Sequence, residues 1–299
     1  MPSFLHSGDA GDAIYALPTI KALGGGLLYF DSRPWTRSRF TPNLLLSLKS
    51  LLEAQEAIEE VRLHAGEKFD FDLSTFRNGG YKLGDTIVER QRRWLCAPKL
   101  DLSKPWLKVD SRPGYGHKVT VNRAPRWLGF HFPWKVVADK LRDKLLFLGL
   151  PEEHRGFEKE FGKIDYQPTR DFLEAARIIA GSHFFIGNQS ACNAIANGLH
   201  KATLLEVCPY APDCYLPREN AIYSIDGGLD CEILGERLSL PPYHPRSGWY
   251  SEVRGKRFYS DTEIHALILA KAEYSRRLLP LPEEELQAIR YSEAQLEFV

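Results

Sequence analysis

Two aspartates lie on one predicted turn near the beginning of the chain. In the stretch SGDAGDAIYALP, Asp9 and Asp12 each follow a glycine, between a short apolar run and a segment with apolar residues at helical spacing. A carboxylate at such a strand-to-helix turn can accept the proton of a substrate hydroxyl. It can also cap the helix or complement its dipole, and for Asp9 the shaping of the turn is the favoured role. Beside them, His6 is a candidate for substrate contact, with a structural turn histidine as the alternative.

A second polar turn follows the apolar run SHFFIG. Asn188, Gln189 and Ser190 stand there at the predicted start of a helix, in GNQSACNAIA. The free N–H groups and the dipole of a helix N-terminus favour anions, so these residues are candidates to bind a diphosphate. Capping of the helix without any ligand is the alternative role.

Charged side chains also follow other predicted strands of the second half. Arg123 and Arg126 come after KVTVN, where bidentate contact with phosphate and surface salt bridging are the two alternatives. Glu206 ends the strand ATLLEV and can accept hydrogen bonds from ribose hydroxyls, or serve only as a capping or surface acid. Lys135 opens a helix on the same side, next to Trp134, for which a place in the core is favoured.

Predicted strands and helices alternate along most of the chain. Strands are expected at SFLH, LLYFD, HKVTVN, KLLFLGL, SHFFIG and ATLLEV, with helices between them, which predicts an α/β fold with two parallel sheets. The predicted domains are residues 1–112, residues 113–260 and a C-terminal helical part, residues 261–299, whose first helix is capped by Ser260 and Glu263. Ligands of such sheets bind beyond the carboxyl ends of the strands, which is where the polar turns lie.

Several other chemistries lack their sequence pattern. SGDAGDA has neither the third glycine of a dinucleotide fingerprint nor the lysine of a phosphate-binding loop. Asp70 and Asp72 have the spacing of a metal-binding pair but lie within an alternating strand pattern, and the nine histidines form no zinc motif. GNQSA lacks the last glycine of a serine hydrolase elbow. We therefore expect no metal and no bound cofactor.

Composition excludes strong global attraction to nucleic acid. The 299 residues include 39 basic and 39 acidic side chains, so the formal net charge is zero. The charge is uneven, because residues 82–144 hold 15 Lys or Arg against 6 Asp or Glu, and RPWTRSRF (residues 33–40) adds a basic and aromatic run. Five scattered cysteines and the lack of a long apolar segment predict a cytoplasmic protein without a membrane span.

The order of motifs resembles the heptosyltransferase-like glycosyltransferases. GDAIYALPTIKAL is similar to their opening Gly-Asp and Leu-Pro helix, RWLGFHFPWKVVADKL to their Trp-Pro helix, and RDFLEAARIIAGSHFFIGNQSACNAIANGLHKATLLEV to their signature. The resemblance covers most of the chain and implies a GT-B fold, two facing Rossmann-like domains with the active site between them. The chain departs from the family at Gln189-Ser190-Ala191 and at Ala194, where the family commonly has Asp-Ser-Gly and a histidine.

The resemblance implies a role for each polar turn. Asp12 matches the family's Gly-Asp and is expected to be the general base, with His6, Asp9 and Gly11 on the acceptor side in the first domain. The second domain is expected to bind a nucleotide-sugar donor as co-substrate, without a metal. A saccharide acceptor ranks above a modified DNA base because the chain carries no net positive charge. A non-catalytic nucleotide or sugar-phosphate binding protein is the alternative.

Overall fold

The computed structural model of the chain describes residues 1–32, 41–79, 86–129 and 132–208, together with residues 214, 216, 218, 220–224, 252–253 and 256–257. Three predicted features lie outside the described residues: the basic run at residues 33–40, the helix capped by Ser260 and Glu263, and the rest of the predicted part 261–299.

The first unit is a parallel sheet of four strands in the order β3-β2-β1-β4. The strands are β1 (Ser3–His6), β2 (Gly26–Phe30), β3 (Ile58–Leu63) and β4 (Phe71–Asp72). Gly26 is required at the start of β2, since its φ is +144° and a Cβ there would lie 1.9 Å from the carbonyl oxygen of Pro2. All three pairings in this sheet are parallel.

Helices α1 (Ala10–Ala22), α2 (Pro42–Glu53) and α3 (Ile87–Trp94) belong to the first unit, with a short 3₁₀ helix, η2 (Phe76–Gly79), after β4. The Thr41 hydroxyl accepts a hydrogen bond from the Leu44 N–H at 3.1 Å, and Pro42 occupies the first helical position of α2. The predicted helical spacing of Ile14, Leu17 and Ile20 in α1 is confirmed, and all three side chains are buried.

The second unit is a parallel sheet of six strands in the order β10-β9-β8-β5-β6-β7. Its strands are β5 (Val119–Asn122), β6 (Leu145–Phe147), β7 (Asp165–Tyr166), β8 (Phe184–Asn188), β9 (Thr203–Glu206) and β10 (Ala221–Ser224). Its helices are α4 (Trp134–Leu141), η3 (Arg142–Lys144), α5 (Pro151–Phe161), α6 (Phe172–Gly181) and α7 (Ala191–Gly198). A separate antiparallel pair joins β11 (Glu252–Val253) to β12 (Lys256–Arg257). The two parallel sheets confirm the predicted α/β fold.

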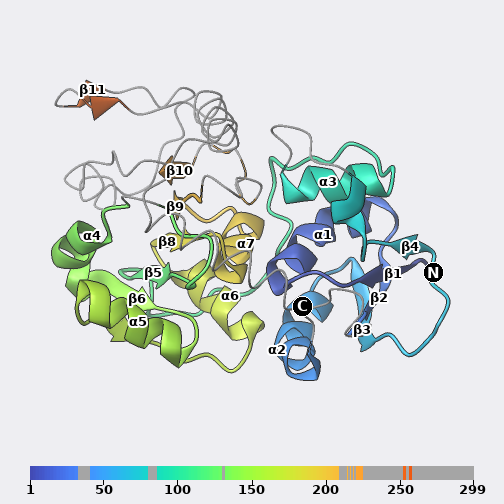
Figure 1. Cartoon of the computed structure of the whole chain (residues 1–299), viewed down its shortest axis with the longest axis horizontal. Helices are drawn as coiled ribbons and strands as arrows, with labels where there is room; N and C mark the ends of the chain where they lie inside the picture. The colour runs from blue at the N-terminus through green and yellow to red at the C-terminus, as the bar shows by residue number, and fades with distance from the viewer. Residues whose placement is uncertain are drawn as a thin grey trace, which may run out of the picture.

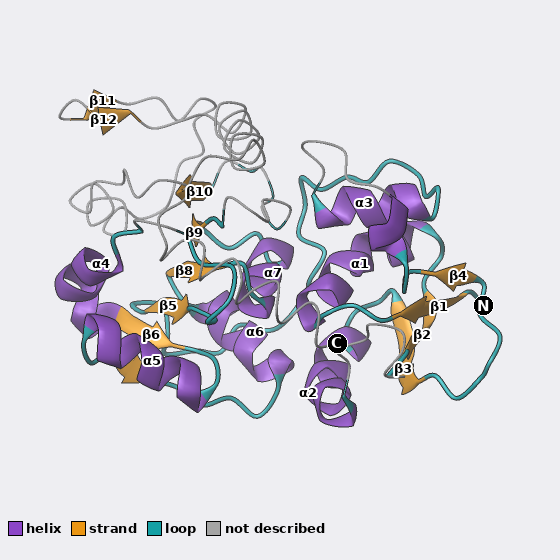
Figure 2. Ribbon diagram, viewed as in Figure 1, coloured by secondary structure: helices purple, strands orange, loops and turns teal. Residues whose placement is uncertain are grey.

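The two units lie side by side, with α1 and α2 of the first facing α6 and α7 of the second (Figure 1). Helices α4 and α5 cover the opposite face of the second sheet (Figure 2). One hydrophobic core therefore runs across the junction and includes Phe4, Ile14, Ile178, Phe185 and Ile195. A second core lies between the outer face of the second sheet and helices α4 and α5, around Val121, Trp134 and Phe157. Trp134 is a core residue, which confirms the role favoured from the sequence.

The predicted boundary at residue 112 lies within residues 95–118, a segment without helix or strand that links α3 to β5. This linker packs on the second unit, where the N–H groups of Trp106 and Leu107 both donate to the carbonyl oxygen of Gly198 at 3.0 Å. The domain limits themselves stay a prediction.

Candidate functional site

The carboxyl end of β1 carries the turn with the two aspartates. Asp9 is the N-cap of α1, and its backbone N–H donates to Oδ2 of Asp12 at 3.3 Å in a capping box. Asp12 lies in the first turn of the helix and is 4% exposed. Both capping and a role in chemistry are thus compatible with its place, and the groups around it decide what its carboxylate can do.

Arg77 binds the carboxylate of Asp12. Its Nη2 atom lies 2.9 Å from Oδ1 and 2.8 Å from Oδ2, although the two residues are 65 positions apart in the sequence. The contact follows from the sheet order: β4 pairs with β1, so the 3₁₀ helix after β4 reaches the same edge as the turn after β1. Burial raises the pKa of Asp12, but the charge and hydrogen bonds of Arg77, together with smaller effects of His6 and the Asp9 N–H, outweigh burial and keep that pKa below its ordinary value. Asp12 is therefore ionised at neutral pH.

His6 lies behind this pair and is fully buried. Its Nδ1 atom accepts a hydrogen bond from the Gly8 N–H at 2.9 Å, which leaves the proton of the neutral ring on Nε2. Burial lowers the pKa of His6 to about 4. A Cβ at Gly8 would lie 2.6 Å from Oδ2 of Asp12 and 2.7 Å from Cε1 of His6. Position 8 therefore requires glycine, because the side chains of Asp12 and His6 both pack against its backbone.

The burial of His6 makes stability sensitive to acid. The unfolded chain takes up a proton on His6 near pH 6.5 and the folded chain only near pH 4, so stability is complete above pH 6.5 and falls as the pH drops towards 4. We expect a loss of about 2 kcal/mol at pH 5 from this residue. Urea unfolding at pH 7, 6 and 5 measures it, and the loss should shrink by that amount in His6→Asn. If His6→Asn loses as much stability between pH 7 and pH 5 as the unsubstituted protein, the loss comes from another group and not from His6. The half-buried His200 is such a group, since burial lowers its pKa to about 4 as well and the variant keeps it.

The second unit reaches this turn through Arg126. Its Nη1 atom lies 3.1 Å from Oδ2 of Asp9, so an ion pair joins the two units at the carboxyl edges of their sheets. Asn188, at the end of β8, holds the segment that carries Arg126. Its Oδ1 accepts from the Ala124 N–H at 3.0 Å, and its Nδ2 donates to the carbonyl oxygens of Ala124 and Arg126, both at 2.8 Å. Asn188 therefore fixes the arginine turn, and direct contact of this amide with a nucleotide stays a prediction.

Glu206, at the end of β9, is completely buried and already has three protein donors. It accepts from the Gly129 N–H at 3.0 Å, from Trp134 Nε1 at 2.8 Å and from Arg123 Nε at 3.2 Å. Burial raises the pKa of Glu206, and these donors oppose that rise. Arg123 is also 3.0 Å from Glu160. The surface salt bridge that sequence allowed for Arg123 is thus a half-buried network, and the proposed contacts of both residues with a donor stay predictions.

The remaining predicted residues have structural partners. Ser190 is the N-cap of α7 and accepts from the Asn193 N–H at 3.4 Å, while the Gln189 Oε1 accepts from the Cys208 N–H at 2.6 Å. A Cβ at Gly11 would lie 3.8 Å from both Ala191 and Ala194 of α7, so Gly11 belongs to the helix junction. Lys135 pairs with Asp139 at 2.6 Å on the exposed side of α4. Their predicted roles in binding stay untested.

Two residues that contact Asp12 were not identified from the sequence, because both lie far from it along the chain. Arg77 follows the short strand β4, and Gln91 lies in α3, where its Nε2 donates to the carbonyl oxygen of Asp12 at 2.9 Å. The one usable signal was the strand FDFD, because a strand beside β1 must deliver the next residues to the same edge.

Within the described part of the chain, no group of three or more His, Cys, Asp or Glu side chains has the geometry to hold a metal ion. In the same part of the chain, no helix has the length and apolar character that crossing a membrane requires.

The chain is similar in structure to solved glycosyltransferases. Heptosyltransferase WaaC of E. coli with ADP is 13% identical, with 80% of this chain and 97% of that chain covered and a TM-score of 0.49. A glycosyl transferase family 9 protein of Veillonella parvula is 11% identical, with 90% and 97% covered and a TM-score of 0.48. The iron-containing dodecameric glycosyltransferase TibC of enterotoxigenic E. coli is 12% identical, with 92% and 77% covered and a TM-score of 0.45.

No family model matches the sequence, and no curated protein matches it.

Proposed function

We propose that the chain is a glycosyltransferase that moves a sugar from a nucleotide-sugar donor to a hydroxyl group of an acceptor, with Asp12 as general base and without a metal. The observation that carries the proposal is the buried, ionised Asp12 carboxylate at the carboxyl edge of the first sheet, beside the Arg126–Asp9 ion pair that joins this edge to the second sheet. The carboxylate of Asp12 in the first unit and the guanidinium of Arg126 from the second unit thus meet at the same turn. A transfer reaction needs both a base and a cation close to the bond that breaks.

In the proposed reaction, the acceptor oxygen attacks the anomeric carbon of the donor and its proton passes to Asp12. The bond between that carbon and the diphosphate oxygen breaks, and its electron pair leaves with the nucleoside diphosphate. Arg126 and the N-terminus of α7 are the proposed partners of the departing negative charge. The acceptor is proposed to be a saccharide bound by the first unit near His6, Asp9 and Gly11.

Arg77 is proposed to tune the base. Its contact lowers the pKa of Asp12, so the carboxylate is ionised but weakly basic, and substrate that displaces Arg77 would strengthen it. In Arg77→Met the pKa of Asp12 should rise, because only the smaller effects of His6 and of the Asp9 N–H then oppose burial. We expect the acid limb of the pH profile of kcat/KM to move to higher pH. An unmoved limb would mean that another group titrates.

Donor binding without metal is the direct test of the proposal. Nucleoside diphosphates should raise the melting temperature in metal-free buffer, because a ligand of the folded state stabilises it. Addition of a chelator should leave the increase unchanged, and a screen of uridine, adenosine, guanosine and thymidine diphosphates identifies the base. An increase that appears only with Mg²⁺ or Mn²⁺ would overturn the metal-independent mechanism.

A non-catalytic nucleotide or sugar-phosphate binding protein is the competing function. It is suggested by Gln189, Ala191 and Ala194, at which the resembling family has other residues. Both functions predict the thermal shift, so turnover separates them. A binding protein would raise its melting temperature with the ligand but release no nucleoside diphosphate from any nucleotide sugar.

A further inference from the structure

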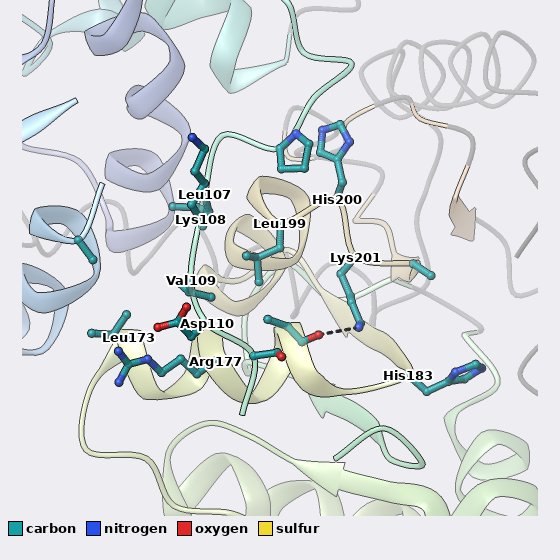
Figure 3. Close-up of a pocket in the computed structure, with 15 residues that line it drawn as sticks. Leu107, Lys108, Val109, Asp110, Leu173, Arg177, His183, Leu199, His200 and Lys201 are labelled. Carbon is teal, nitrogen blue, oxygen red and sulfur yellow. Dashed lines mark hydrogen bonds between the residues drawn. The ribbon is translucent and has the colours of Figure 1, made fainter. Parts of the chain in front are cut away.

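A cavity of about 790 Å³ lies beside the residues that precede strands β8 and β9 of the second sheet (Figure 3). His183 lines it directly before β8, and Lys201 lines it two residues before β9. The carboxyl ends of the same strands carry Asn188 and Glu206. Since a strand of five residues spans about 16 Å, a ligand in this cavity would not touch the candidate site.

The charged groups of the cavity are mostly cationic. Lys108, Arg177 and Lys201 line it, against the single carboxylate of Asp110, and two histidines, His183 and His200, complete the titratable groups. Lys108 is neutralised by Glu56, 2.9 Å away. No ion pair with Lys201 or Arg177 occurs among the described residues, so two cations face the cavity without a carboxylate partner.

Lys201 is the least exposed of the three cations that line the cavity. Its Nζ atom donates to the carbonyl oxygen of Ala180, near the end of α6, at 3.1 Å, which uses one of its three protons. The cavity wall removes water from the ammonium group, and this burial lowers the pKa of Lys201 to about 8. Two N–H groups of a poorly hydrated cation are thus left for a ligand, and an anion would restore the lost charge stabilisation.

The rest of the wall is largely apolar. Leu107, Val109, Leu173 and Leu199 line the cavity from the linker, from α6 and from the end of α7 (Figure 3). The cavity is partly open to solvent, and its volume is in the range of pockets that bind small organic molecules. A free inorganic ion would leave these apolar side chains without a partner, whereas an anion with an apolar body would cover them.

We propose that this cavity binds a small organic anion with an apolar body, whose anionic group is received by Lys201 and Arg177. The cavity is formed by both units, since Ala54 follows α2 in the first and residues 107–111 belong to the linker. A bound anion therefore contacts both units and stabilises their junction. This site does not depend on the proposed reaction.

Octanoate is the probe that tests the proposal, with 1-octanol and inorganic phosphate as matched partial probes. In calorimetric titration at pH 8, octanoate should bind more tightly than either partner, because only octanoate offers both charge and apolar surface. Binding should take up protons, since the anion raises the pKa of Lys201, and titrations in two buffers of different ionisation enthalpy measure this uptake. Equal binding of octanoate and 1-octanol, equal binding of octanoate and phosphate, or no binding of octanoate would overturn the proposal.

Variants locate the site. Lys201→Met and Arg177→Gln should each weaken octanoate binding by about tenfold, and only Lys201→Met should abolish the proton uptake. Lys104→Gln, which removes an exposed lysine from the same linker, should leave both unchanged. The melting temperature of each variant without ligand verifies that it folds. Octanoate binding of folded Lys201→Met that matches the unsubstituted protein in affinity and proton uptake would contradict the assignment.

Discussion

Replacing Asp12 by Asn should lower kcat by about 10²- to 10⁴-fold and leave the affinity for the donor nearly unchanged. The amide keeps the shape of the side chain and one acceptor oxygen for Arg77, but it cannot take the proton of the acceptor hydroxyl. The guanidinium of Arg77 is half exposed, so water can replace the lost carboxylate oxygen and the fold should persist. Release of nucleoside diphosphate from the nucleotide sugar measures kcat, and thermal shift with the diphosphate measures binding.

Asp171→Asn is the matched control for this variant. Asp171 caps α6, where its Oδ1 accepts from the Glu174 N–H at 2.8 Å, far in the sequence from the two aspartates of the turn. If Asp12 serves only its helix, both variants should lose a similar amount of stability and neither should lose turnover. Turnover of Asp12→Asn within a few-fold of the unsubstituted protein would return Asp12 to a capping role.

The fold was largely predictable because its signals are local. The apolar spacing of Ile14, Leu17 and Ile20 predicts the buried helix α1, and the alternation of strands and helices predicts parallel sheets, which together place the aspartate turn at a carboxyl edge. The shared core between the units was not predictable. Ile178 and Ile195 have the same helical periodicity whether their helices face their own sheet alone or also a second unit.

The candidate site was predictable only in part. Asp12 and Arg126 stand out because each lies in the segment that follows a predicted strand. The place of Arg77 depends instead on which strand lies beside β1, and strand order is a long-range property. For Glu206, the sequence predicts the position of the side chain at a strand end but not its surroundings. A carboxylate at the end of a strand has the same sequence pattern whether it faces a ribose or, as here, is buried under Trp134 and Arg123.

Replacing Arg126 by Ala should raise the dissociation constant for the nucleoside diphosphate by about 10- to 150-fold, as expected for the loss of a charged hydrogen bond worth about 1.5 to 3 kcal/mol. The side chain is 28% exposed and approaches the turn from the second unit, so its removal leaves no cavity in either core. Metal-free calorimetric titration with the diphosphate identified by thermal shift measures the change. The kcat of the variant should fall as well, because the same cation is proposed to stabilise the leaving group.

Asp9→Asn separates binding from structure. It weakens the same ion pair as Arg126→Ala but leaves the guanidinium in place. If Arg126 acts only by joining the two units, both variants should weaken diphosphate binding, Asp9→Asn less than Arg126→Ala, since the amide oxygen can still accept a hydrogen bond from the guanidinium. If Arg126 binds phosphate, Asp9→Asn should bind the diphosphate at least as tightly as the unsubstituted protein, because the competing carboxylate charge has been removed and the arginine is released towards the ligand. The sign of the change in Asp9→Asn thus decides whether the contact between the units is a structural clamp or one that the donor replaces.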